Sequence, residues 1–342
     1  MDNCNKSIIE KHIDYLYKSV SNIEYNFIKD RGVLIDKLYQ SITTTKYRRS
    51  RLMADDGIDI RKKITNAVEK SEPIEFSFPF GGCKLWQFNE FPQPDWAEFF
   101  NLLYMVSFLK NTCCVYEPGA VLTYSSGDVV MNMANNIPEK YPKEYISVFK
   151  NLLSIFNQAT PTNLHLDLVQ IKSLYSEQEF NSEYKLLLEK NRTFFSLEEN
   201  QPLLLHQSKS AQNNFLPKGI NDYSEYTESD FWEIIKDSAI KDFAFLELSK
   251  RRKFNKNSNR IQIVNVNGPS LSIHLGSCMR STTQFWVGVG VCELKNGKLS
   301  NNILSKNQLS KYYASFENEY VEVDTFLNDY SDNFKKIRLF YL

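Results

Sequence analysis

The sequence is poor in the residues that build metal sites and has no pattern for a disulfide framework. Its 342 residues include four histidines and six cysteines, and no two cysteines form a Cys-x-x-Cys pair. No two histidines stand at ligand spacing from each other, as a zinc site with a histidine pair would require. We therefore expect reduced thiols, no structural zinc and no tightly bound metal.

Net charge and long apolar runs are also missing. The 41 basic residues balance 41 acidic ones, so no overall positive field attracts nucleic acid or an anionic membrane surface. No stretch approaches the roughly 20 apolar residues that span a bilayer. The first residues lack the basic-then-apolar pattern of a secretory signal. This balance predicts a cytoplasmic protein with neither nucleic acid nor a membrane as a partner.

Three common catalytic motifs are absent as well. Gly288-Val289-Gly290 is not followed by the third glycine of a dinucleotide-binding loop, and no Walker-type G-x-x-x-x-G-K-[ST] occurs. The chain also has no G-x-S-x-G elbow, the usual position of a hydrolase serine. Dinucleotide, nucleoside-triphosphate and serine-hydrolase chemistry therefore lose support.

Hydrophobic periodicity favours one α/β domain preceded by helices. A hydrophobic content of 42% allows a large core. Apolar residues at helical spacing cover the first 45 residues and continue over 58–68. Further helix patterns cover 96–109, 143–157 and 228–248, and strand patterns cover 74–78, 113–116, 120–124, 161–173, 261–266, 271–274, 285–293 and 337–341.

This pattern divides the chain into two parts. We expect residues 1–70 to form a helical segment packed on the main domain, and 71–342 to form a single α/β catalytic domain. A polar insertion near 176–225 is either a helix with an active-site cover or a long surface excursion.

The first candidate site lies where a strand is followed by a turn and a helix. Lys84 comes from a glycine-containing turn and could hold a phosphate or carboxylate. Asp95 stands at a helix N-cap position, with Glu98 three residues later completing a capping box. The alternatives are that the box merely starts a helix and that Lys84 is a solvated turn residue.

The second candidate site is a row of polar residues on a strand. Alternation places Ser270, Ser272 and His274 on one face, and the turn that follows contains Arg280. These groups could bind a substrate, transfer a proton and hold an anion. The alternative is a half-exposed strand with one solvated face.

Asp128 and Lys241 complete the set of candidates. Asp128 follows the end of a strand, where α/β folds usually place ligand contacts, although a hairpin tip needs no function. Lys241 by itself would be an ordinary surface lysine on a helix. Basic runs at 48–51 and 250–253 are either solvated helix faces or anion-binding groups.

The order of these segments resembles the isocyanide (isonitrile) synthase family, the group associated with pyoverdine and dityrosine biosynthesis. Each motif is short, but the succession runs from about residue 74 to residue 280. The matching segments are Phe78-Pro79-Phe80-Gly81-Gly82-Cys83-Lys84, Pro94-Asp95-Trp96-Ala97-Glu98, Tyr116-Glu117-Pro118-Gly119-Ala120, Ser126-Gly127-Asp128, Lys241-Asp242-Phe243-Ala244 and Ser270-Leu271-Ser272-Ile273-His274.

The resemblance implies a Rossmann-like mixed sheet flanked by helices and an enzyme of secondary metabolism. Such a transferase condenses the amine of an amino acid, possibly aromatic, with a ketose phosphate such as ribulose 5-phosphate, and needs no cofactor. One sugar carbon becomes the isocyanide carbon. The resemblance assigns catalysis to His274, Asp95, Glu98 and Asp128, and substrate binding to Lys84, Ser270, Ser272, Arg280 and Lys241.

The chain departs from the family pattern at positions that bear charge. Two extra residues precede Lys84, the second lysine expected before Pro94 is missing, and Ser270 stands where the family has arginine. Each lost charge-assisted bond is worth about 1.5 to 3 kcal/mol. The second substrate is therefore either held by other basic residues or is another carbonyl or acyl compound. A further alternative is a non-catalytic metabolite-binding protein.

Overall fold

The computed structural model describes residues 2–47, 52–80, 84, 92–127, 132–215, 227–251, 259–264, 272–274, 288–315 and 319–341. Its helices are α1 (Asp2–Ser21), α2 (Arg31–Ile42), α3 (Ala54–Lys70), α4 (Trp96–Val115), α6 (Lys140–Ala159), α7 (Glu177–Ser196), α8 (Gln201–Asn214), α9 (Glu228–Arg251) and α10 (Lys306–Ser315). Its strands are β1 (Ile74–Phe80), β2 (Ala120–Ser126), β3 (Leu164–Gln170), β4 (Ile261–Val264), β5 (Ser272–His274), β6 (Gly288–Lys295), β7 (Lys298–Ser305), β8 (Glu319–Glu322) and β9 (Lys336–Tyr341). Short 3-10 helices are η1 (Ile171–Leu174), η2 (Glu198–Asn200) and η4 (Asp332–Phe334).

A parallel sheet with the order β3-β2-β1-β4-β5 forms the centre of the fold. Helices α4 and α6 connect β1 to β2 and β2 to β3, after which the chain returns to the other side of β1. The strand order therefore reverses between β1 and β4. In open α/β sheets, ligands bind at such a reversal, outside the carboxyl ends of the strands.

Aromatic side chains fill the space between this sheet and its helices. Phe76 of β1 meets Phe108 of α4 edge to face, with ring centroids 5.9 Å apart. Phe78 meets Tyr124 of β2 in the same way at 5.6 Å, and Tyr124 in turn meets Phe149 of α6 at 5.1 Å. Such pairs add to the large apolar area that these rings remove from water.

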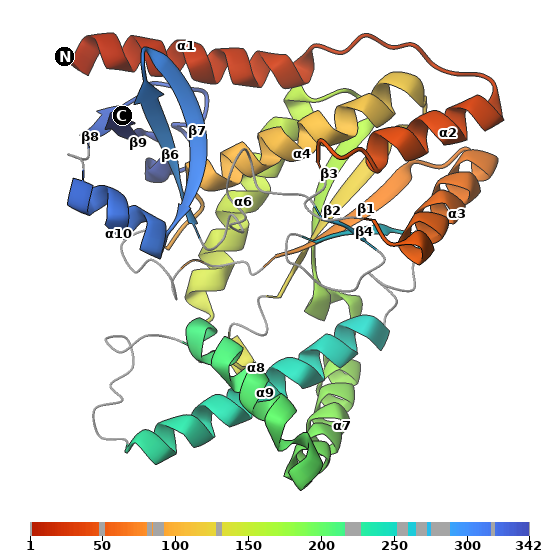
Figure 1. Cartoon of the computed structure of the whole chain (residues 1–342), viewed down its shortest axis with the longest axis vertical. Coiled ribbons are helices and arrows are strands. Elements are labelled where there is room, and N and C mark those ends of the chain that lie inside the picture. Colours follow the sequence, from red (N-terminus) through yellow and green to blue (C-terminus); the bar gives the residue numbers. More distant parts are fainter. Residues whose placement is uncertain are drawn as a thin grey trace.

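A second, mixed sheet with the order β7-β6-β9-β8 lies beside α1 and α4 (Figure 1). Strands β6 and β7 form a hairpin whose turn residues Asn296 and Gly297 both have positive φ, 51° and 71°. An Asn-Gly pair suits this turn because both central residues must be left-handed. The second sheet thus packs against the same helix that covers the parallel sheet.

The α/β fold class with flanking helices and a helical N-terminal segment is confirmed. The strands form two sheets instead of one. Buried residues of α1, α2 and α3, such as Ile13, Leu38 and Ile64, belong to the same hydrophobic cluster as the parallel sheet. None of the described helices has the length and apolar character required to cross a bilayer. The division at residue 70 stays a prediction.

Helices α7, α8 and α9 lie together beyond the end of the parallel sheet at which β3 leads into α7 (Figure 1). They have two apolar clusters of their own. One joins Phe245 and Leu248 of α9 to Tyr184 of α7, and the other joins Ile235 of α9 to Leu204 of α8. The expected polar insertion therefore consists largely of helices, although residues 216–226 lie outside the described part of the chain.

The strand predicted over 113–116 is wrong, because α4 continues to Val115. This helix is buried on nearly all sides, so its sequence shows no contrast between a polar and an apolar face. A short apolar run such as Cys113-Cys114-Val115 then fits either element equally well. Strands β7 and β8 and helix α10 were not predicted.

Candidate active site

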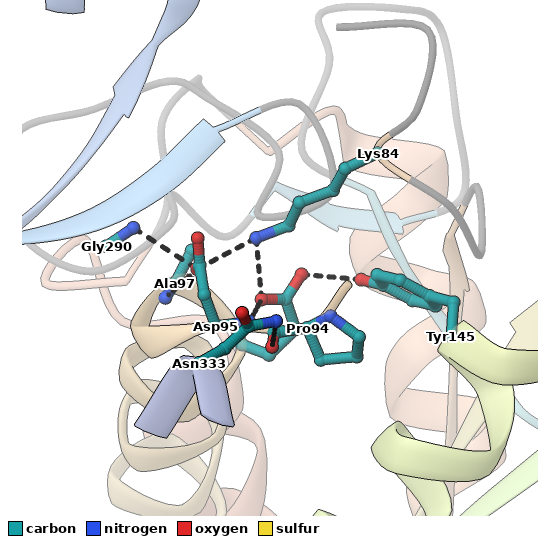
Figure 2. Close-up of polar contacts among 8 residues, drawn as sticks. Lys84, Pro94, Asp95, Ala97, Tyr145, Gly290 and Asn333 are labelled. Carbon is teal, nitrogen blue, oxygen red and sulfur yellow. Dashed lines mark hydrogen bonds and ion pairs between the residues drawn. The ribbon is translucent and has the colours of Figure 1, made fainter. Parts of the chain in front are cut away.

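Lys84 follows the carboxyl end of β1 and is 0% exposed. Its ammonium group lies between two carboxylates. Lys84 Nζ is 2.8 Å from Asp95 Oδ1 and 2.7 Å from Glu98 Oε2. Dashed lines in Figure 2 mark the ion pairs of Lys84. A buried ammonium needs such partners, because removing an unpaired charge from water is costly.

The two carboxylates are held by the first turn of α4. Asp95 caps the helix and accepts a bond from the Ala97 N–H at 2.7 Å, while the Asp95 N–H donates to Glu98 Oε2 at 2.7 Å. These contacts confirm the predicted capping box. The box does more than start a helix, since both of its side chains also bind Lys84.

Tyr145 of α6 adds a third donor to Glu98. Its hydroxyl donates to Glu98 Oε1 at 2.5 Å, and both side chains are fully buried. Glu98 therefore accepts bonds from an ammonium, a phenol and a backbone N–H. We use the name carboxylate cluster for Lys84, Asp95, Glu98 and Tyr145.

Burial raises the pKa of Glu98 to about 8, and the negative charge of Asp95 adds to this effect. The positive charge of Lys84 and the hydrogen bonds from Lys84 and Tyr145 oppose it and lower the pKa. The result is a carboxyl group whose proton exchanges close to neutral pH. A general acid or base works best with a pKa in this range.

The second sheet holds the start of α4 in place. The Gly290 N–H of β6 donates to Asp95 Oδ1 at 3.3 Å, and Asn333 Nδ2 of η4 donates to the Pro94 carbonyl at 3.0 Å (Figure 2). A Cβ atom at Gly290 would lie 2.3 Å from the Trp96 carbonyl carbon and from the Ala97 nitrogen. Only glycine allows this approach of β6 to the helix.

The polar strand of the second candidate site joins the same sheet. Strand β5 pairs with β4, so that Ser272 is in register with Gln262 and His274 with Val264. The backbone of His274 thus lies at the carboxyl end of β5. This is the same edge of the sheet as the carboxyl end of β1, which precedes Lys84. Ser270, Arg280 and Asp128 lie outside the described residues, as does the basic run 48–51.

Lys241 lies on α9, and its ion-pair partner is not a member of the carboxylate cluster. Its Nζ forms an ion pair with Asp237 Oδ2 at 2.7 Å, one turn earlier on the same helix. Asp237 also binds Arg192 of α7 at 3.3 Å. The structure therefore brings Lys84, Asp95 and Glu98 together and engages Lys241 in another contact.

Sequence reasoning missed Tyr145, Gly290 and Asn333. Tyr145 is 47 residues from Glu98, and Gly290 is 195 residues from Asp95. No local pattern links residues so far apart. The one available signal was Gly288-Val289-Gly290, in which small residues on a strand indicate a close backbone approach.

No set of three histidine, cysteine, aspartate or glutamate side chains in the described part of the chain could hold a metal ion. The carboxylate cluster places a carboxyl group whose pKa is raised to about 8 next to an ammonium and a phenol.

Comparison with known proteins identifies a solved structure that has the same fold. No protein-family model and no curated protein matches the sequence. The crystal structure of the PvcA protein from Pseudomonas aeruginosa superposes with a TM-score of 0.59 at 17% identity, covering 90% of this chain and 99% of that one. The chain shares its fold with PvcA. At this identity, the likeness to PvcA extends to the fold alone.

A tyrosyl-tRNA synthetase from Aeropyrum pernix superposes with a TM-score of 0.27 at 9% identity, covering 67% of this chain and 52% of that one. This value is too low to indicate a common fold. The PvcA match differs in its higher TM-score and in its coverage, which includes nearly the whole of both chains.

Proposed function

We propose that the protein is an enzyme of the isocyanide synthase type that acts on the amine of an amino acid. Two independent observations support the proposal. The motifs from Phe78 to His274 follow the order of that family, and the fold is that of PvcA, a pyoverdine-cluster isonitrile synthase. The family-like segments also contain Glu98, a buried carboxyl group whose pKa is raised to about 8.

The carboxylate cluster is the observation that carries the proposal. Condensing an amine with a carbonyl compound requires proton transfer when the amine adds and again when water leaves. Glu98, with a pKa of about 8, can give and take a proton near neutral pH. In the proposed enzyme Glu98 is the proton-transfer group, Lys84 and Asp95 set its charge state, and Tyr145 orients it.

The bonds of Lys84 bear on the second substrate. Because its ammonium is already shared by Asp95 and Glu98, it is not free to hold a phosphate. This favours a divergent relative in which other basic residues bind the ketose phosphate, or in which a different carbonyl or acyl compound takes its place. The second candidate function is therefore modification of an amino acid with another co-substrate.

The test is mass spectrometry on purified protein incubated with pooled amino acids, with and without ribulose 5-phosphate. The expected product has the mass of one amino acid plus one carbon and minus two hydrogens, and forms only when protein and sugar are both present. Consumption of an amino acid without the sugar would point to the second candidate. If no amino acid is consumed in either mixture, the enzymatic proposal is refuted.

Matched variants test the assigned roles. Glu98→Gln keeps the size of the side chain but cannot transfer a proton, so turnover should fall by two orders of magnitude or more, about the usual contribution of general acid-base catalysis. Glu139→Gln is the control, because Glu139 is an exposed partner of Lys143 at the start of α6. His274→Ala separates an enzyme, which loses turnover, from a metabolite-binding protein, which keeps its ligand.

A further inference from the structure

Asp242 of α9 has a carboxylate oxygen that the fold leaves unsatisfied. Its Oδ1 is shielded from solvent and has no hydrogen-bond partner among the residues that the structure describes. The neighbouring Asp237 on the same helix is different, because it binds both Lys241 at 2.7 Å and Arg192 at 3.3 Å. Two aspartates on one helix thus differ completely in their partners.

Asp242 lies one turn after a residue of α9 that contacts the segment following β2. Ser238, one turn earlier, has its hydroxyl 3.5 Å from Asn135 Oδ1, in the segment that follows β2. Residues four apart share one face of a helix. Closer to the C-terminal end of α9, the Leu248 carbonyl accepts a hydrogen bond at 2.6 Å from the hydroxyl of Tyr175, which follows β3 and η1. The helix therefore crosses the strand ends (Figure 1), and Asp242 lies between Ser238 and Leu248 in its sequence.

The surroundings of Asp242 make its charge costly. Burial raises the pKa of this carboxyl group to about 7. Across from it, burial and then the charge of Asp242 raise the pKa of Tyr184 on α7. A buried carboxylate without a partner opposes folding, and such groups concentrate at functional sites.

We propose that Asp242 is a substrate-binding residue and that its carboxylate receives the ammonium group of the amine substrate. The inference rests on the proposed function and deepens it. Within the segment Lys241-Asp242-Phe243-Ala244, the ammonium of Lys241 is paired with Asp237, and Asp242 is the charged side chain left without a counter-ion. An ammonium ion supplies the donor and the charge that its buried oxygen lacks.

The charged and titratable groups around Asp242 are few. Tyr184 and Arg192 come from α7, and Asp237 and Lys241 from α9 itself. From the described part of the segment after β2, Asn135 places an amide next to Ser238. Both cations are paired with Asp237, so in the described structure the counter-charge for Asp242 is left to a ligand.

Thermal unfolding across pH tests whether the fold leaves Asp242 unpaired. The folded protein keeps the Asp242 proton to higher pH than the unfolded chain does, so this group lowers stability as pH rises from about 4 to about 7. Asp242→Asn should therefore melt above the wild type at about pH 8.5 and level with it at about pH 4. Asp237→Asn, the control, should melt below the wild type at about pH 8.5. An Asp242→Asn protein that melts below the wild type at about pH 8.5 overturns the proposal.

Ligand-induced stabilisation tests the binding role, with individual L-amino acids as probes and no sugar present. At least one should stabilise the wild type and Asp237→Asn equally, and should bind Asp242→Asn roughly 10- to 100-fold more weakly, as expected for one lost charge-assisted bond. Equal binding by Asp242→Asn, or no stabilisation of the wild type by any amino acid, overturns the proposal.

The two proposals fail in different ways. If the wild type binds an amino acid through Asp242 but forms no isocyanide with ribulose 5-phosphate, the proposed reaction is wrong and the binding role stands. If Asp242→Asn forms the isocyanide with an unchanged KM for the amino acid, the binding role is wrong and the reaction stands.

Discussion

Glu98 and Asp242 both have carboxyl groups whose pKa values are raised by burial, yet their hydrogen-bond partners differ. Glu98 accepts bonds from Lys84, Tyr145 and the Asp95 N–H. Asp242 Oδ1 has no partner among the described residues. Burial raises both pKa values, to about 8 for Glu98 and to about 7 for Asp242. The fold therefore supplies the hydrogen-bond partners of Glu98, whereas Asp242 Oδ1 is left to be paired by a ligand.

This contrast has a structural origin. The carboxylate cluster lies where α4, α6 and β6 meet, and each of these elements contributes a contact to it. Asp242 lies where α9 crosses the strand ends, at the edge of the sheet where α/β folds bind ligands. Changes in the first region should therefore lower stability, whereas neutralising Asp242 should raise it.

The largest expected effect is that of Lys84→Met. Removing the ammonium leaves Glu98 and Asp95 side by side in a buried site, which should cost about 3 to 5 kcal/mol of unfolding free energy. The loss should be smaller below about pH 8, where Glu98 keeps its proton, and should grow above it, where the charged Glu98 of the wild type is balanced by Lys84. Urea unfolding at about pH 5 and about pH 9 measures both values.

The matched control is Lys241→Met. Lys241 pairs with Asp237 at 2.7 Å, the same length as the bond between Lys84 and Glu98, but in a half-exposed site. A pair of this kind is worth about 1 kcal/mol or less. If the two variants lose the same stability, burial of the Lys84 pair does not matter and the contrast with α9 is lost.

Gly290→Ala should have the next largest effect. The new Cβ would lie 2.3 Å from backbone atoms of Trp96 and Ala97, which cannot rotate away as a side chain can. We expect a loss of about 3 kcal/mol, at the upper end of the usual range for overpacking. Gly32→Ala in α2 is the control, since its Cβ would meet only Asp30 Oδ1 at 3.4 Å. That helix should gain up to about 1 kcal/mol. Equal losses in both variants would mean that β6 does not constrain the start of α4.

The sequence was sufficient for the parts of the site that are close together along the chain. Asp95 and Glu98 are three residues apart at a helix start, and a capping box has a recognisable pattern. Lys84 was singled out by its place after a strand. That both carboxylates bind Lys84 could not be predicted, because it depends on where Lys84 lies in space relative to the start of α4.

The remaining parts of the site come from distant elements. Tyr145 reaches Glu98 only because α6 packs beside α4, and Gly290 reaches Asp95 only because the second sheet packs on α4. The sequence also did not separate the strands into two sheets, since alternation shows that a strand has two faces but not which strand it pairs with. For Asp242 the sequence contains no signal, because an aspartate without a partner looks the same as one with a partner.

Tyr145→Phe should have the smallest effect, and its dependence on pH carries the information. The hydroxyl bond to Glu98 lowers the pKa of that carboxyl group, so its loss should raise the pKa further. The folded protein already keeps the Glu98 proton between about pH 4.5 and about pH 8, where the unfolded chain has lost it, and stability falls as pH rises through this window. In the variant, the fall should extend to higher pH. The deficit should therefore grow from about 1 kcal/mol at pH 6, where a neutral hydrogen bond is lost, to about 2 kcal/mol above pH 8, where a bond to a carboxylate is lost. Urea unfolding at pH values from about 5 to about 9 measures it. A deficit that stays constant across this range would show that Tyr145 does not distinguish the two charge states of Glu98, and the phenol would then be a packing residue with no influence on proton transfer.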